Sequence, residues 1–173
     1  LFHFLGLSLI DSTKIVFGLA FLLSGLTMYL WIKNFLGIHA GVIAGMLYMF
    51  APYRFVDLYV RGAIGEHVAF IFPPLIFYFL LKLSKKLSKW YLLGGSLSLS
   101  GILLSHNAIS IMFFPFIFFY GLYLLYLSKN RKPYIINLIS LVILGLGLSA
   151  FFWIPAFFEG KYTLRDIVTK GEY

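Results

Sequence analysis

One stretch of this chain, residues 15–32, runs for eighteen residues between Lys14 and Lys33 without a charged side chain. An apolar helix of about 18–20 residues matches the roughly 30 Å hydrocarbon thickness of a bilayer. A soluble domain of 173 residues, 61% of them hydrophobic, could not bury so much apolar surface in one core. The sequence therefore predicts an all-α fold, a polytopic transmembrane helix bundle. The further apolar segments lie at about 67–81, 90–105, 108–127 and 134–154.

Polar residues divide the chain into about six complete spans and one partial span at residues 1–10, all within a single transmembrane domain over 1–173. The cluster Asp11, Ser12 and Thr13 is typical of an N-cap, and it predicts a helix from about residue 14 to 33. The chain begins within an apolar run and is expected to be a fragment of a longer protein.

Glycine and proline predict the next boundaries. Gly37 should separate the first long helix from a short one that ends near Ala51, because Pro52 cannot continue a helix. Pro73 and Pro74 should kink or restart the helix that follows.

The charges predict an orientation. Eight cations without an acid among them fall at alternate helix ends, and all six acids fall at the opposite ends. Because an excess of Lys and Arg marks cytoplasmic loops, the loop 52–67, the turn at 105–108 and the tail 155–173 should face outward from a bacterial-type plasma membrane. The eight cations are Lys33, Lys82, Lys85, Lys86, Lys89, Lys129, Arg131 and Lys132.

Composition also excludes several classes. The chain has no cysteine, so disulfides, thiol catalysis and thiolate metal sites are excluded. Its formal net charge of +8 lies between hydrophobic spans, which indicates contact with membrane lipid and not with nucleic acid.

The stretch "PYRFVDLYVRGAIGEH", residues 52–67, concentrates charge in an otherwise apolar chain. If Pro52 opens a short helix, the spacings of three and four place Arg54, Asp57 and Arg61 on one face. Gly62 should end that helix. Glu66 would then open the next membrane helix, where the helix dipole favours an acid.

Two interpretations of this stretch stay open. The planar forks of Arg54 and Arg61 suit phosphate, and the carboxylates of Asp57 and Glu66 could supply acid–base chemistry or the oxygen ligands of Mg²⁺ or Mn²⁺. Alternatively, Arg54, Asp57 and Arg61 form an ion-pair ladder that only orients an interfacial helix.

Other polar residues are weaker candidates. Tyr59 lies in the same stretch, and His106 and Asn107 form the second outward turn, which could reach the same pocket. His106 is better explained as a polar group at a helix end than as a ligand or base. His67 should point away from Glu66 on its helix, although a metal site shared by the two is an alternative.

Four segments carry a resemblance to known families. The sequences "AGMLYMFAPYRF" and "GEHVAFIFPPLIFYFLL", with the charged loop between them, are similar to the second outer-loop region of GT-C-type membrane glycosyltransferases. The segments "LLSHNA" and "FFWIPAFFEGKY" resemble bacterial membrane proteins related to 6-pyruvoyl-tetrahydropterin synthase and YfhO-type membrane proteins. The pterin name implies no pterin chemistry here.

The resemblance implies the central part of a GT-C-like module that uses a lipid-linked sugar donor, a polyprenyl phosphate, in cell-envelope glycan assembly. In such enzymes an acid in the first outer loop is the usual base or metal ligand, and an acid in the second assists it; only the second has a counterpart here, Glu66. Two arginines around Asp57 depart from that pattern and favour phosphate contact. The alternatives are a non-catalytic protein that binds or transports a lipid-linked glycan, and a structural membrane anchor.

Overall fold

The computed structural model describes residue 4 and residues 6–159, and every element in this part of the chain is helical. This confirms the predicted all-α bundle. In chain order the elements are α1 (Leu9–Leu36), α2 (Ile38–Met49), α3 (Pro52–Phe55), the π-helical turn η2 (Val56–Arg61), α4 (Ile64–Ala69), α5 (Phe72–Lys85), α6 (Lys89–Ser105), α7 (Asn107–Leu127), α8 (Arg131–Leu148) and α9 (Ala150–Phe158).

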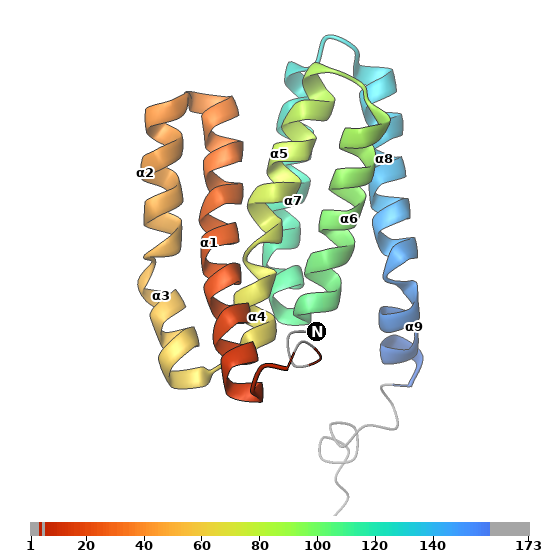
Figure 1. Cartoon of the computed structure of the whole chain (residues 1–173). Coiled ribbons are helices and arrows are strands. Elements are labelled where there is room, and N and C mark those ends of the chain that lie inside the picture. Colours follow the sequence, from red (N-terminus) through yellow and green to blue (C-terminus); the bar gives the residue numbers. More distant parts are fainter. Residues whose placement is uncertain (1–3, 5, 160–173) are drawn as a thin grey trace, which may run out of the picture.

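The long helices run roughly parallel or antiparallel to one another (Figure 1). An antiparallel pair, α1 and α2, stands on one side, and α5, α6, α7 and α8 form the other side. Helix α1 joins the two parts because it packs against α2, α4 and α5. Helix α3 and the turn η2 continue α2 along the same direction, so the short predicted helix at 52–61 extends a membrane helix and does not lie across its end.

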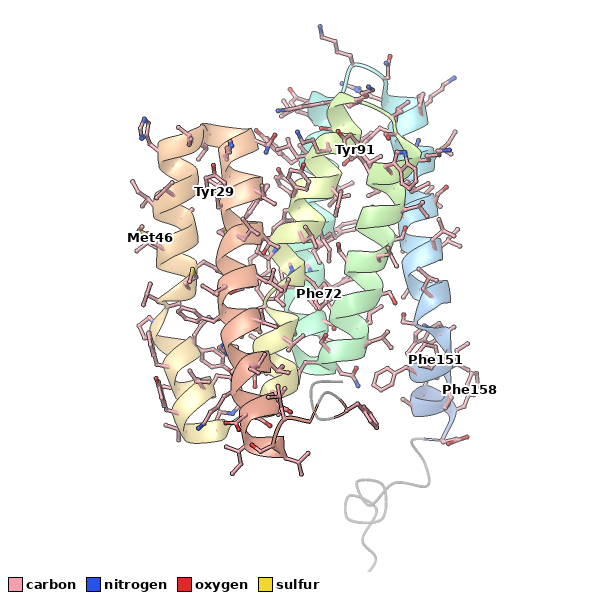
Figure 2. All side chains as sticks on the ribbon, in the orientation of Figure 1. Tyr29, Met46, Phe72, Tyr91, Phe151 and Phe158 are labelled. Atoms are coloured by element: carbon pink, nitrogen blue, oxygen red, sulfur yellow. The ribbon has the colours of Figure 1, made fainter. Side chains whose placement is uncertain are left out.

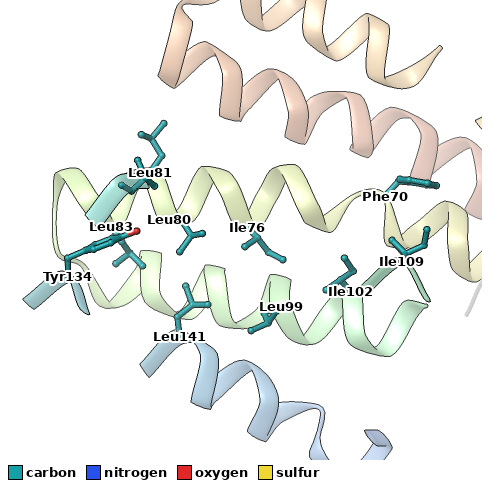
Figure 3. Packing of buried hydrophobic residues seen from close by; sticks show 12 residues of the cluster. Phe70, Ile76, Leu80, Leu81, Leu83, Leu99, Ile102, Ile109, Tyr134 and Leu141 are labelled. Atoms are coloured by element: carbon teal, nitrogen blue, oxygen red, sulfur yellow. The ribbon is translucent and has the colours of Figure 1, made fainter. Parts of the chain in front are cut away.

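The hydrophobic core lies between α5, α6, α7 and α8 (Figure 3). Ile76 and Leu80 of α5 face Leu99 of α6 and Leu141 of α8, and all four are buried. The Gly- and Ser-rich sequence of α6 allows this close approach. Ser96, for example, donates a hydrogen bond of 3.2 Å to the Leu141 carbonyl of the neighbouring helix.

Large apolar side chains cover the outside of the bundle (Figure 2). Met46 and Phe158 are among the many that are exposed, as expected for a surface in contact with lipid. Within the described residues, four helical segments are long and apolar enough to cross a membrane, whereas six complete spans were expected; α2 and α6, with 12 and 17 residues, are shorter. The four segments are Leu9–Leu36, Ile64–Lys85, Asn107–Leu127 and Arg131–Leu148.

The first long helix begins earlier than predicted. Ser8 is its N-cap and accepts the backbone N–H of Asp11 at 3.0 Å, so the expected capping cluster at 11–13 lies inside the first turn of α1. The reason is that Ser8, too, offers a hydroxyl to the free N–H groups of the turn. Leu9 and Ile10 therefore belong to α1, and not to the end of a preceding helix.

Most other boundaries confirm the sequence analysis. Gly37, at φ +99°, separates α1 from α2, and Pro52 occupies the first turn of α3. Pro73 and Pro74 restart the chain at the beginning of α5. The predicted helix 134–154 is interrupted at Ser149, whose hydroxyl donates to the Gly145 carbonyl at 3.0 Å.

The two ends of the bundle carry different charges. The eight acid-free cations all lie at or near the turns α1–α2, α5–α6 and α7–α8, which meet at one end, here called the basic end. The opposite end, here called the polar end, holds η2, α4 and the α6–α7 turn, and it contains every acid among the described residues. The segregation is the one that the sequence predicted, while the direction of each end across the membrane stays a prediction.

Candidate functional site

The charged stretch folds into a tight reversal of the chain at the polar end. The turn η2 has one residue more per hydrogen-bonded ring than an α-helix, and such turns are frequent at functional sites. Gly62 ends it in the left-handed conformation, at φ +59°, which an L-residue adopts only at a cost. The reversal brings α3 and η2 against the start of α4, so that residues thirteen positions apart meet.

The reversal gathers charged and polar side chains into one cluster, which has an exposed half and a buried half. Its members are Tyr53, Arg54, Asp57, Arg61, Glu66 and His67. Arg61 lies at the centre of the exposed half. Its Nη1 lies 2.7 Å from Oε2 of Glu66 and 3.8 Å from Oδ1 of Asp57, and it donates a hydrogen bond of 2.7 Å to the Tyr53 hydroxyl. The Tyr53 hydroxyl in turn donates to Oε1 of Glu66. The Arg61 side chain is 46% exposed, whereas both carboxylates are buried.

Arg54, Asp57 and His67 form the buried half. Nη2 of Arg54 lies 3.1 Å from Nε2 of His67, and Nδ1 of His67 lies 3.6 Å from Oδ2 of Asp57. Arginine has no acceptor, so Nε2 must accept this hydrogen bond and the imidazole proton must sit on Nδ1, facing Asp57. His67 is therefore already bonded on the nitrogen that a general base would need.

Aromatic rings enclose this buried half. The rings of Phe17 and Phe21 in α1 pack on His67, and the Arg54 guanidinium lies 5.7 Å from Phe21 and 5.1 Å from Phe70. A guanidinium over ring faces gains cation–π attraction, which offsets part of its lost hydration. Burial lowers the pKa of Arg54. Burial, followed by the charge of Glu66, raises the pKa of Asp57 to about 6.

The buried half is only partly satisfied. Among the described residues, Nε and Nη1 of Arg54 and both carboxylate oxygens of Asp57 are buried without a hydrogen-bond partner. Buried polar atoms without partners are rare in proteins, and each costs about 1–3 kcal/mol. A chain that only needed a stable helix end would gain by replacing these residues with apolar ones. Their presence supports a site over an orienting ion-pair ladder.

The structure brings together four of the seven predicted site residues. Arg54, Asp57, Arg61 and Glu66 form the cluster, but they lie in two layers because Arg54 and Asp57 are buried while Arg61 is not. The burial of Arg54 keeps its guanidinium from direct contact with a solute in this conformation, contrary to its expected role at a phosphate.

The other predicted residues lie around the cluster. Tyr59 is 78% exposed and stacks on Phe55, with ring centroids 6.4 Å apart. His106 caps α7, and its Nδ1 accepts the backbone N–H of Ile109 at 3.4 Å. Asn107 is the first residue of that helix. The α6–α7 turn nevertheless packs close to α4 because Gly65 has no side chain.

Two residues of the cluster were not predicted as site residues from the sequence. Tyr53 bridges Arg61 and Glu66, and His67 joins Arg54 to Asp57. The spacing of eight between Tyr53 and Arg61 was a usable signal, since it equals about two helical turns. For His67 there was none, because its partners come from a chain reversal that no local pattern encodes.

An open apolar groove of about 720 Å³ adjoins the cluster between α1 and η2. Phe17 and Phe21 line it on one side and Phe55 and Leu58 on the other, and Lys14 lies at its rim. Since Phe17 and Phe21 also contact His67, the groove and the buried half of the cluster share a wall.

In this conformation the cluster holds a guanidinium near both carboxylates, and binding of Mg²⁺ or Mn²⁺ there stays a prediction. Among residues 4 and 6–159, no group of three or more histidine, aspartate or glutamate side chains could hold a metal ion. Nη1 of Arg61 also occupies the space between the carboxylates of Asp57 and Glu66, where Mg²⁺ or Mn²⁺ would need oxygen ligands. The guanidinium is thus the counter-ion of both acids.

Comparison with known proteins gives a family and one distant relative. The family model described as "6-pyruvoyl-tetrahydropterin synthase related domain; membrane protein" matches residues 2–169. An uncharacterized protein of Lactococcus lactis subsp. cremoris (strain MG1363) is 28% identical over 153 residues, which is 83% of this chain. The match covers 25% of that relative, so the chain spans about a quarter of its length. No solved structure matches.

Proposed function

This chain belongs to the family of membrane proteins described as the 6-pyruvoyl-tetrahydropterin synthase related domain, and we propose that its polar cluster binds the phosphate of a lipid-linked sugar within a membrane glycosyltransferase. The observation that carries the proposal is the position of Arg61, exposed at the mouth of a buried carboxylate pair and close to an apolar groove. The donor would be a polyprenyl-phosphate sugar, and the acceptor a cell-envelope glycan.

Arg61 is suited to hold the phosphate. Its contacts among the described residues all go through Nη1, so its other N–H groups remain for paired hydrogen bonds to phosphate oxygens. The groove between α1 and η2 offers an apolar surface for the first isoprene units, and Lys14 at its rim adds a second positive charge. An amphiphile with a phosphate head and a hydrocarbon chain matches both features.

Glu66 would support the chemical step. The acceptor hydroxyl forms a bond to the anomeric carbon, the bond from that carbon to the phosphate oxygen breaks, and polyprenyl phosphate leaves with the electron pair. A carboxylate takes the proton of the hydroxyl. The phosphate would draw Arg61 away from Oε2 of Glu66. The Glu66 carboxylate would then be free to act as a base only while a donor is bound. Arg54 and His67 then position Asp57 and touch no substrate.

One observation favours a second candidate, a protein that binds or moves the lipid-linked glycan without reaction. Both carboxylates are engaged by Arg61, and Tyr53 also bonds Glu66, so no acid of the cluster is unpaired in this conformation. The two functions differ in whether Glu66 is needed for turnover or only for shape.

Variants of the full-length protein test the proposal. Arg61→Ala should weaken binding of the polyprenyl-phosphate sugar by about 10- to 100-fold, and Arg61→Lys should restore it only in part. Glu66→Gln should lower turnover by about 10²-fold with donor binding nearly unchanged. Arg131→Ala, an exposed arginine at the basic end, is the matched control.

The measurements are complementation in cells, followed by donor binding and turnover with purified protein. Normal turnover in an Arg61→Ala, Glu66→Gln double variant would refute the site. Normal binding without detectable turnover in the native protein would favour the second candidate.

A further inference from the structure

A second cavity lies at the basic end, far from the cluster, between the α5–α6 turn and the α7–α8 turn. Its volume is about 540 Å³. Three lysines line it, together with Asn130 and Tyr134 at the start of α8. The lysines are Lys85, Lys86 and Lys129.

The positive charge around this cavity is not neutralised within the described part of the chain. Every ion pair among those residues belongs to the cluster at the polar end. Lys85 donates to the Asn34 carbonyl at 3.1 Å, which fastens the end of α1 to α5. Lys86 and Lys129, which come from the two different turns, are exposed as well.

Two further features of the cavity favour an anion. Tyr134 is only 1% exposed, and its hydroxyl has no hydrogen-bond partner among residues 4 and 6–159. Figure 3 shows it at the end of the core beside Leu83, which also lines the cavity. The 18-residue helix α8 starts at this cavity, and the side chain of its N-cap residue, Asn130, makes no capping hydrogen bond. The first backbone N–H groups of α8 are therefore not capped by that side chain, and they form the positive end of the helix dipole.

We propose that this cavity binds a phosphate group, supplied by an anionic lipid of the leaflet at the basic end. Lys86 and Lys129 would hold the phosphate from two turns, and the Tyr134 hydroxyl would donate to one of its oxygens. The exposed Leu87 and Leu127 flank the cavity and offer apolar surface to the glycerol and the first methylene groups. A general inward bias of lysine explains the charges, but it does not explain a cavity that contains a buried, unpartnered hydroxyl.

The full-length protein in mild detergent is titrated with short-chain phosphatidylglycerol, and separately with inorganic phosphate, while binding is followed by native mass spectrometry and thermal unfolding. Loss of one lysine near a phosphate is expected to weaken binding about fivefold, so Lys86→Gln with Lys129→Gln should weaken it about 25-fold. Tyr134→Phe should weaken it about tenfold without lowering the unfolding temperature of the lipid-free protein, since the lost hydroxyl had no partner.

The controls are Lys89→Gln and Lys132→Gln, which change the same two turns without touching the cavity. They should bind phosphatidylglycerol as the native protein does. Equal losses in the lining and the control variants would overturn the proposal and leave only diffuse attraction. Inorganic phosphate binding as tightly as the lipid would also overturn the lipid as source. None of these variants touches Arg61 or Glu66, so the result is independent of sugar transfer.

Discussion

Asp57→Asn tests the electrostatics of the cluster most directly. Asp57 is fully buried in η2, and burial raises its pKa from 3.8 to about 6. A folded-state pKa above the unfolded value means that folding favours the protonated acid. The stability contributed by this acid is therefore complete below pH about 3.8 and is lost as the pH rises through about 6. A pKa difference of roughly two between the folded and the unfolded state corresponds to about 3 kcal/mol in the free energy of unfolding.

The assay is unfolding of purified native and Asp57→Asn protein in mixed micelles at a series of pH values between about 4 and 7.5. Asparagine does not ionise, so the variant should gain up to about 3 kcal/mol relative to the native protein from the low to the high end of this range. Comparing two pH values removes any loss of packing that does not depend on pH. Glu159→Gln, which removes an exposed acid at the same end, is the control for the loss of one negative charge. Parallel pH curves for the native and Asp57→Asn proteins would refute the reasoning.

Three other changes test the fold around the site. Gly65→Ala should lower the free energy of unfolding by about 1–3 kcal/mol because the new Cβ would lie 2.7 Å from a backbone carbonyl of α6. The control Gly147→Ala, with open space around it, should be neutral or stabilising. Equal stabilities of the two variants would contradict the close packing of α4 and α6. Arg54→Met should cost about 1–3 kcal/mol in the same unfolding assay because it leaves the buried Nε2 of His67 without its hydrogen-bond donor, and an unchanged stability would count against the buried network. A single cysteine that replaces Ser88 should be shielded from an impermeant external reagent, and one that replaces Ala63 should be labelled by it. The reverse pattern would mean that the predicted orientation is wrong.

The sequence was sufficient for the fold class and for most helix boundaries. The apolar side chains between Lys14 and Lys33 can be removed from water only by lipid or by other helices. Gly37 and Pro52 are residues at which a helix readily ends, so they fix the boundaries of the first helices. The start of α1 was missed because Ser8 and the residues at 11–13 are all good N-caps. Which of them is used depends on where the chain before the helix lies.

The candidate site was predicted as a set of residues and not as an arrangement. Helical spacing correctly placed Asp57 and Arg61 within reach of each other, at 3.8 Å. It did not reveal that Arg54 turns inward to His67, because that contact depends on the reversal at Gly62 and on the aromatic side chains of α1. Burial by a distant helix is a property of tertiary packing, and no local pattern encodes it.

If the cluster binds a phosphate as proposed, its charge balance limits how it can do so. With His67 neutral, the two arginines and the two carboxylates sum to zero, so an arriving phosphate would make the cluster negative. If no metal ion joins Asp57 and Glu66, the simplest compensation is uptake of a proton. Asp57 is the group prepared for this, because its pKa already lies near 6 and a further negative charge would raise it. Under the proposed function, a carboxylate that is costly to bury in the unliganded protein would thus neutralise the bound phosphate, which would link the cost of burying Asp57 to phosphate binding.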